Sequence, residues 1–101
     1  MTGYKDIGVD ELEGRLRQGG LRLVDVRTDA EAARGMIPQG ELSPLHLIPL
    51  RLQELDRGTP TVLGGRSAQA TAFAVASGFA DVNNLQGGIA AWARAGLALE
   101  A

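Results

Sequence analysis

Three short strand-like segments, separated by helix-like patterns, constrain the fold of this chain more than any other feature. They cover residues 21–26, 60–63 and 81–85. The first two are compact, largely apolar runs that end at glycine or polar residues, which is typical of buried strands, and we expect the third, Asp-Val-Asn-Asn-Leu, to be a strand as well. Strands that alternate with helices form a parallel sheet covered on both faces. The sequence therefore predicts an α/β fold with a central parallel β-sheet and helices on both faces.

Five segments carry helix signals. Thr28 and Glu31 form a capping box that opens a brief helix, which Gly35 closes. The other four show apolar residues at helical spacing or an alanine-rich composition with a glycine at the end, and they cover residues 9–16, 45–55, 66–77 and 87–96.

Some single residues inside these segments lead to further expectations. Pro49 falls early enough in the third helix to be tolerated in or near its first turn. Residues 37–40, Ile-Pro-Gln-Gly, predict a turn, because proline fixes φ and glycine permits a positive φ. Phe73 and Trp92 lie on alanine-rich helical faces, where a large side chain most simply fills the core.

The bulk properties indicate an ordinary globular protein. Residues 1–101 suffice for a single domain with one core, and 45% hydrophobic and 22% charged residues lie far from the composition of disordered chains. The net charge of -2, with both signs mixed along the chain, argues against nucleic-acid binding. No apolar run is long enough to span a membrane, and the first residues lack the apolar stretch of a signal peptide. We expect a cytoplasmic protein with no membrane partner.

The sequence contains no cysteine and one histidine, His46. This excludes disulfides, thiolate metal sites and thiol nucleophiles in the sequence as it stands. A single histidine without a second ligand nearby in the sequence does not indicate a metal site, and we expect His46 to be a partly exposed helix residue. We predict neither a metal nor a cofactor.

Three stretches follow one another in order along nearly the whole chain. The first runs from 23 to 27, Leu-Val-Asp-Val-Arg, followed by an acidic helix and then by 34–38, Arg-Gly-Met-Ile-Pro. The second is 65–69, Gly-Arg-Ser-Ala-Gln, and the third extends from Gly78 through the Gly-Gly turn at 87–88 and Trp92 to the Ala-Gly-Leu at 95–97. Together they resemble the rhodanese family of sulfurtransferases, which usually has Gly-His-Ile-Pro where this chain has Gly-Met-Ile-Pro, and in which the second stretch is similar to the end of the active-site loop.

The resemblance implies a rhodanese-like fold with an active-site loop between a strand end and a helix N-terminus. In active members that loop begins with cysteine and ends in Arg-Ser, and its backbone N–H groups hold the persulfide anion that forms on the thiolate. Here the strand that ends at Leu63 runs directly into Gly64, Gly65, Arg66 and Ser67, so part of the loop and its cysteine have no counterpart. Ser67 is no substitute, because its hydroxyl needs an adjacent base and no histidine is nearby in the sequence. We assign no catalytic residue.

The remaining candidate residues each have a functional and a structural interpretation. Gly64, Gly65, Arg66 and Ser67 form either a remnant cradle for a small anion, sulfate or thiosulfate, bound weakly, or a tight turn that needs glycine for a positive φ, which we favour. Asp25 and Arg27 follow a strand near the pocket, and by the resemblance we interpret them as a structural polar contact that braces neighbouring loops.

Two functions follow. The first is a non-catalytic rhodanese-like domain, either a binding or regulatory module or a chain whose active-site loop has been removed. The alternative is a sulfurtransferase, acting on thiosulfate or a persulfide, whose full polypeptide carries a cysteine loop that this sequence lacks. The sequence indicates no particular protein partner or oligomeric state.

Overall fold

The computed structural model describes residues 4–64 and 67–100. Its centre is a five-stranded sheet in which every neighbouring pair of strands is parallel, as predicted. The strands are β1 (Lys5–Ile7), β2 (Arg22–Asp25), β3 (Glu41–Leu42), β4 (Thr61–Gly64) and β5 (Val82–Leu85), and their order across the sheet is β1-β5-β4-β2-β3.

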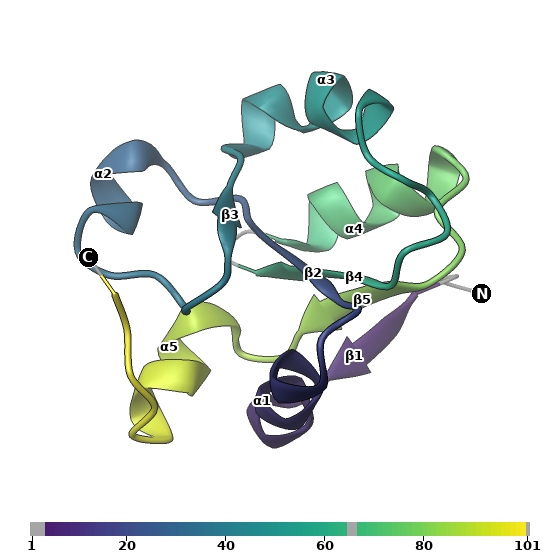
Figure 1. The fold of residues 1–101 in the computed structure, drawn as a ribbon. Helices are drawn as coiled ribbons and strands as arrows, with labels where there is room; N and C mark the ends of the chain where they lie inside the picture. Colours follow the sequence, from purple (N-terminus) through teal and green to yellow (C-terminus); the bar gives the residue numbers. More distant parts are fainter. Residues whose placement is uncertain (1–3, 65–66, 101) are drawn as a thin grey trace.

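Helices cover both faces of this sheet (Figure 1). The helical elements are α1 (Val9–Gln18), α2 (Asp29–Ala32), the 3-10 turn η1 (Leu45–Leu47), α3 (Ile48–Gln53), α4 (Ser67–Ala76) and α5 (Gly88–Arg94). α1 and α5 lie on one face and α3 and α4 on the other, while α2 lies beyond the end of β2 (Figure 1). The predicted fold class is confirmed.

The core divides into two clusters, one on each side of the sheet, because neighbouring residues of a strand point to opposite faces. Leu23 packs with α1 and α5, and its neighbour Val24 packs with α3 and α4. The central strand β4 contributes to both clusters through Val62 and Leu63, and all four of its residues are buried. A strand buried on both faces is typically a continuous run of apolar residues, which explains why β4 could be predicted.

Two edge strands and one helix break differ from the predicted elements. β1 and β3 were not predicted, and each pairs on one side only, with β5 and β2 respectively. The predicted helix 45–55 is divided into η1 and α3. Pro49 lacks the N–H that would donate to the Leu45 carbonyl, and the Ile48 N–H takes that carbonyl in a tighter turn.

The turn at 37–40 is present, but its positive φ belongs to Gln39 (74°) and not to Gly40. The Gly40 N–H donates to the Ile37 carbonyl at 3.1 Å, so Gln39 occupies the third turn position, where type II geometry demands a positive φ. Glycine is favoured at position 40 for a different reason, the limited space: a Cβ there would lie 3.1 Å from the Ile37 oxygen.

Of the two aromatic residues expected in the core, Trp92 is buried and Phe73 is not. The Trp92 side chain is 4% exposed, whereas Phe73 is 42% exposed on the outer side of α4. α4 carries no charged residue and is apolar on every face, so its sequence could not indicate which face packs on the sheet. The expectation for Phe73 was wrong.

α1 and α4 are the longest helices in the described part of the chain, with ten residues each, and none there is long and apolar enough to cross a membrane.

Candidate functional site

The carboxyl ends of the parallel strands meet at one edge of the sheet, and the candidate residues Asp25, Arg27 and Gly64 lie there. Asp25 ends β2 and lies opposite Gly64, which ends β4, in the strand register. The Val26 N–H donates to the Gly64 carbonyl at 3.0 Å and extends this pairing past the strand. Ligands of open α/β sheets bind outside this edge, so it is the place to look for a site.

Asp25 and Arg27 form a bidentate ion pair at this edge. The Arg27 Nε lies 3.0 and 3.1 Å from the two carboxylate oxygens of Asp25, and Nη2 lies 2.7 Å from Oδ2. The Arg27 backbone N–H also donates to Asp25 Oδ1 at 3.0 Å. Asp25 is 3% exposed, so its charge is compensated almost entirely by Arg27.

The same guanidinium reaches the loop that follows α2. Nη1 donates to the Glu31 carbonyl at 3.4 Å and Nη2 to the Gly35 carbonyl at 2.6 Å. Arg27 therefore joins the end of β2 to the end of α2, and most of its five N–H groups donate to acceptors within the protein. The geometry is that of a brace between two loops.

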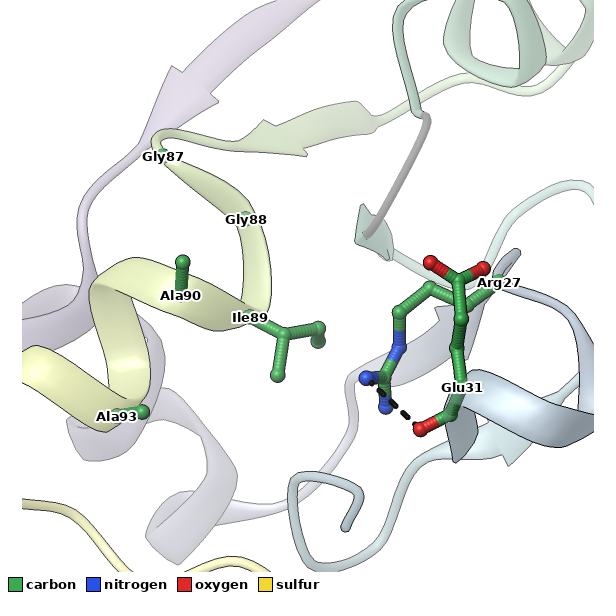
Figure 2. Close-up of a pocket in the computed structure, with 7 residues that line it drawn as sticks. All are labelled: Arg27, Glu31, Gly87, Gly88, Ile89, Ala90 and Ala93. Atoms are coloured by element: carbon green, nitrogen blue, oxygen red, sulfur yellow. Dashed lines mark hydrogen bonds between the residues drawn. The ribbon is translucent and has the colours of Figure 1, made fainter. Parts of the chain in front are cut away.

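Arg27 also lines an open hollow of about 510 Å³ (Figure 2). One wall carries Arg27 and Glu31, and the opposite wall is the first part of α5 with its N-cap, formed by Gly87, Gly88, Ile89, Ala90 and Ala93. The Ile89 side chain points toward the Arg27 guanidinium across the hollow (Figure 2). We call this space the Arg27 hollow.

Two residues connect β4 to α4, because β4 ends at Gly64 and α4 begins at Ser67. Gly65 and Arg66 lie outside the described residues, and so does the side chain of Ser67. We expected a tight turn in which Gly64 and Gly65 allow a positive φ. Gly64 is a strand residue without a positive φ, so this expectation was wrong for Gly64, while Gly65 lies outside the described residues. A Cβ at Gly64 would lie 3.4 Å from Ile89 Cδ1, an ordinary contact.

A second hollow, of about 480 Å³, lies on the other side of β2, and sequence reasoning missed it. It is lined by Val26, Thr28, Pro44, Leu45, His46, Pro49 and Gln69. The only histidine of the chain is exposed on η1, and the fold brings it beside the first turn of α4, which carries Gln69. No local signal could have found this neighbourhood, since it forms between two distant segments.

Neither hollow offers a metal site within residues 4–64 and 67–100. No group of three or more histidine, cysteine, aspartate or glutamate side chains is gathered there in a way that could hold an ion.

Comparison with known proteins places this geometry in a family. Residues 8–95 match the family model described as Rhodanese-like domain. A sulfurtransferase of Allochromatium vinosum is 48% identical over 83 residues, which cover 78% of each chain. A thiosulfate sulfurtransferase, GlpE, of Pseudomonas syringae pv. syringae is 33% identical over 96 residues, which cover 91% of this chain and 90% of its own.

Solved structures agree with the sequence relatives. The crystal structure of a rhodanese-like domain protein from Staphylococcus aureus has a TM-score of 0.82 at 35% identity and covers 96% of this chain and 99% of its own. A human single-domain sulfurtransferase has a TM-score of 0.81 at 27% identity and covers 88% of this chain and 95% of its own.

Proposed function

Because the chain belongs to the rhodanese-like domain family, we propose that it is a non-catalytic member of it, a binding or regulatory module that keeps the fold and has lost sulfur transfer. The observation that carries this proposal is that none of the 101 residues is a cysteine. Persulfide transfer needs a thiolate that attacks the sulfur donor and then carries the sulfur. No other side chain of the protein supplies a sulfur nucleophile.

The connection between β4 and α4 supports the same proposal. In active members, by resemblance, a cysteine loop fills this position and surrounds the persulfide with backbone N–H donors. Only two residues separate Gly64 from Ser67 here. Such a short arc presents few converging donors, and Arg27, whose partner Asp25 lies opposite Gly64 in the strand register, is already engaged in an ion pair.

Sulfur transfer from thiosulfate to cyanide tests the proposal. We expect no thiocyanate above the rate without protein, while an active thiosulfate sulfurtransferase in the same buffer serves as the positive control. Thiocyanate formation that iodoacetamide abolishes would overturn the proposal, because it would reveal a cysteine. Cooperative thermal unfolding of the same sample shows that an inactive protein is folded.

The sulfurtransferase names of the two sequence relatives favour a second candidate: an enzyme whose full polypeptide carries a cysteine loop that this sequence lacks. Intact mass distinguishes the two. A measured mass of 10.6 kDa would indicate the cysteine-free chain. A mass larger by that of several residues, together with a thiol that reacts with iodoacetamide, would indicate the enzyme.

We further propose that the mouth of the β4–α4 connection, Gly64 to Ser67, binds small anions such as sulfate or thiosulfate weakly. The first N–H groups of a helix attract anions, whereas a single arginine, such as Arg66, adds little to the affinity in water. We expect a Kd no tighter than millimolar, about 4 kcal/mol on a 1 M standard state. Sulfate titration followed by the amide resonances of Gly64 to Arg66 measures it, and no shift at tens of millimolar would reduce this segment to a structural turn.

A further inference from the structure

The segment Leu97–Glu100 leaves α5 and crosses to the loop that follows α2. In Figure 1 this yellow segment rises from the end of α5 and ends beside α2. The Met36 N–H donates to the Glu100 carbonyl at 2.6 Å, and the Glu100 N–H donates to the Met36 carbonyl at 2.7 Å, an isolated antiparallel bridge. Two segments far apart in the sequence are thus joined by a reciprocal pair of hydrogen bonds.

Two further contacts hold the segment at both of its ends. Near α5, the Trp92 Nε1–H donates to the Ala98 carbonyl at 2.9 Å. Near α2, Leu99 packs so closely on Gly35 that a Cβ on this glycine would lie 3.1 Å from the Leu99 Cβ. Gly35 has a φ of 142°, so both its backbone conformation and the space around it favour glycine.

Gly35 connects this segment to the Arg27 hollow. The carbonyl of Gly35 accepts the 2.6 Å hydrogen bond from Arg27 Nη2, and Arg27 forms one wall of the hollow. The other wall is α5, from which the segment departs. The segment is therefore attached to both walls, through Trp92 on one side and through Gly35 and Met36 on the other.

We propose that Leu97–Glu100 is a strap that sets the width of the Arg27 hollow, and that its release lets the two walls move apart as one cooperative opening. The docked strap depends on few contacts: Leu99 is 38% exposed, and Ala98, Leu99 and Glu100 are all exposed. Segments with little burial open at lower free energy than the core. The device goes beyond the proposed function and works in the same way whether or not the domain transfers sulfur.

Amide hydrogen exchange and a distance measurement test the strap in the full chain. The Met36 and Glu100 amides are protected only by each other's carbonyls, so their protection factors should be equal and lower than those of Val62 and Leu63 in β4. Leu99→Ala should lower both by the same factor, roughly tenfold. Trp92→Phe, which removes the indole donor and part of the ring volume but keeps an aromatic core residue, should lower both roughly fivefold.

The absence of native cysteines allows clean spin labelling of the two walls at Ala33→Cys and Arg94→Cys, both exposed positions. We expect one narrow distance distribution between the labels, and a broader distribution with a longer component when Leu99→Ala is added. Leu50→Ala, at a 65% exposed position on α3, is the matched control and should change neither readout. Unequal protection of the two amides, or an unchanged distribution in Leu99→Ala, would overturn the proposal.

Discussion

The Asp25 carboxylate at the end of β2 receives both Nε and Nη2 of Arg27, at 2.7 to 3.1 Å, and also the Arg27 backbone N–H. A nearly buried carboxylate held in this way depends on its cation, because the loss of one partner leaves the other charge without compensation. The two residues lie only two positions apart in the sequence, but the Arg27 guanidinium that the pair holds in place also donates to the carbonyls of Glu31 and Gly35.

We predict that Asp25→Asn lowers the free energy of unfolding by about 3 kcal/mol, because the Arg27 guanidinium then stays near the sheet edge without its counter-charge. Urea unfolding measures the change. Glu54→Gln, which weakens an exposed ion pair with Arg51, should cost less than about 1 kcal/mol. An equal effect of the two substitutions would contradict the brace.

A second prediction concerns the two aromatic residues. Trp92→Ala should cost about 3 to 5 kcal/mol, because it empties a buried site and removes the donor to the Ala98 carbonyl. Phe73→Ala should cost less than about 1 kcal/mol, because Phe73 is nearly half exposed on α4 and alanine is the better helix former. Thermal unfolding of both variants checks the contrast, and a large loss for Phe73→Ala would place this side chain in the core after all.

A third prediction compares two glycines. Gly87 has a φ of 77°, and a Cβ there would lie 2.7 Å from the Ala91 Cβ, so Gly87→Ala should cost about 2 kcal/mol or more. Gly14 lies inside α1 with nothing within 4 Å of its would-be Cβ, so Gly14→Ala should add about 0.5 to 1 kcal/mol. The midpoints of urea unfolding should move in opposite directions, and a shift in the same direction would refute the comparison.

A fourth prediction concerns pH. Hydrogen bonds from the Thr59 hydroxyl (2.7 Å) and from the Gly58 N–H (3.2 Å) lower the pKa of Asp56 from its ordinary value. A carboxyl whose pKa is lower in the folded state stabilises the fold above its unfolded pKa of about 4, and this contribution disappears as pH falls through the folded value. The stability advantage of the native protein over Asp56→Asn should therefore be present at pH 6 and shrink toward pH 2 to 3.

Urea unfolding of both proteins across this pH range provides the measurement for Asp56. Asp29→Asn, at an exposed position on α2, is a control for the general loss of negative charge. An advantage that stays constant from pH 6 to pH 2, or that grows as the pH falls, would show that the Asp56 hydrogen bonds do not favour the ionised carboxylate.

The chain's local patterns determined much of this fold. β2 and β4 each carry two consecutive buried aliphatic residues, because the two strands are covered on both faces. The capping box of Thr28 and Glu31 forms as predicted, since its hydrogen bonds join residues three apart. The family resemblance likewise rests on short motifs. Signals that arise within a few residues of one another can be read from a sequence without knowing the fold.

Tertiary structure alone decided the rest. β1 and β3 are short edge strands that exist because β5 and β2 offer them a parallel partner, and the orientation of Phe73 on α4 depends on which side of an evenly apolar helix meets the sheet. The antiparallel bridge between Met36 and Glu100 and the hollow beside His46 join distant segments. Such contacts form only after the chain has closed long loops. Their partners are determined by the packing of the whole sheet, and for this physical reason no local pattern of residues encodes them.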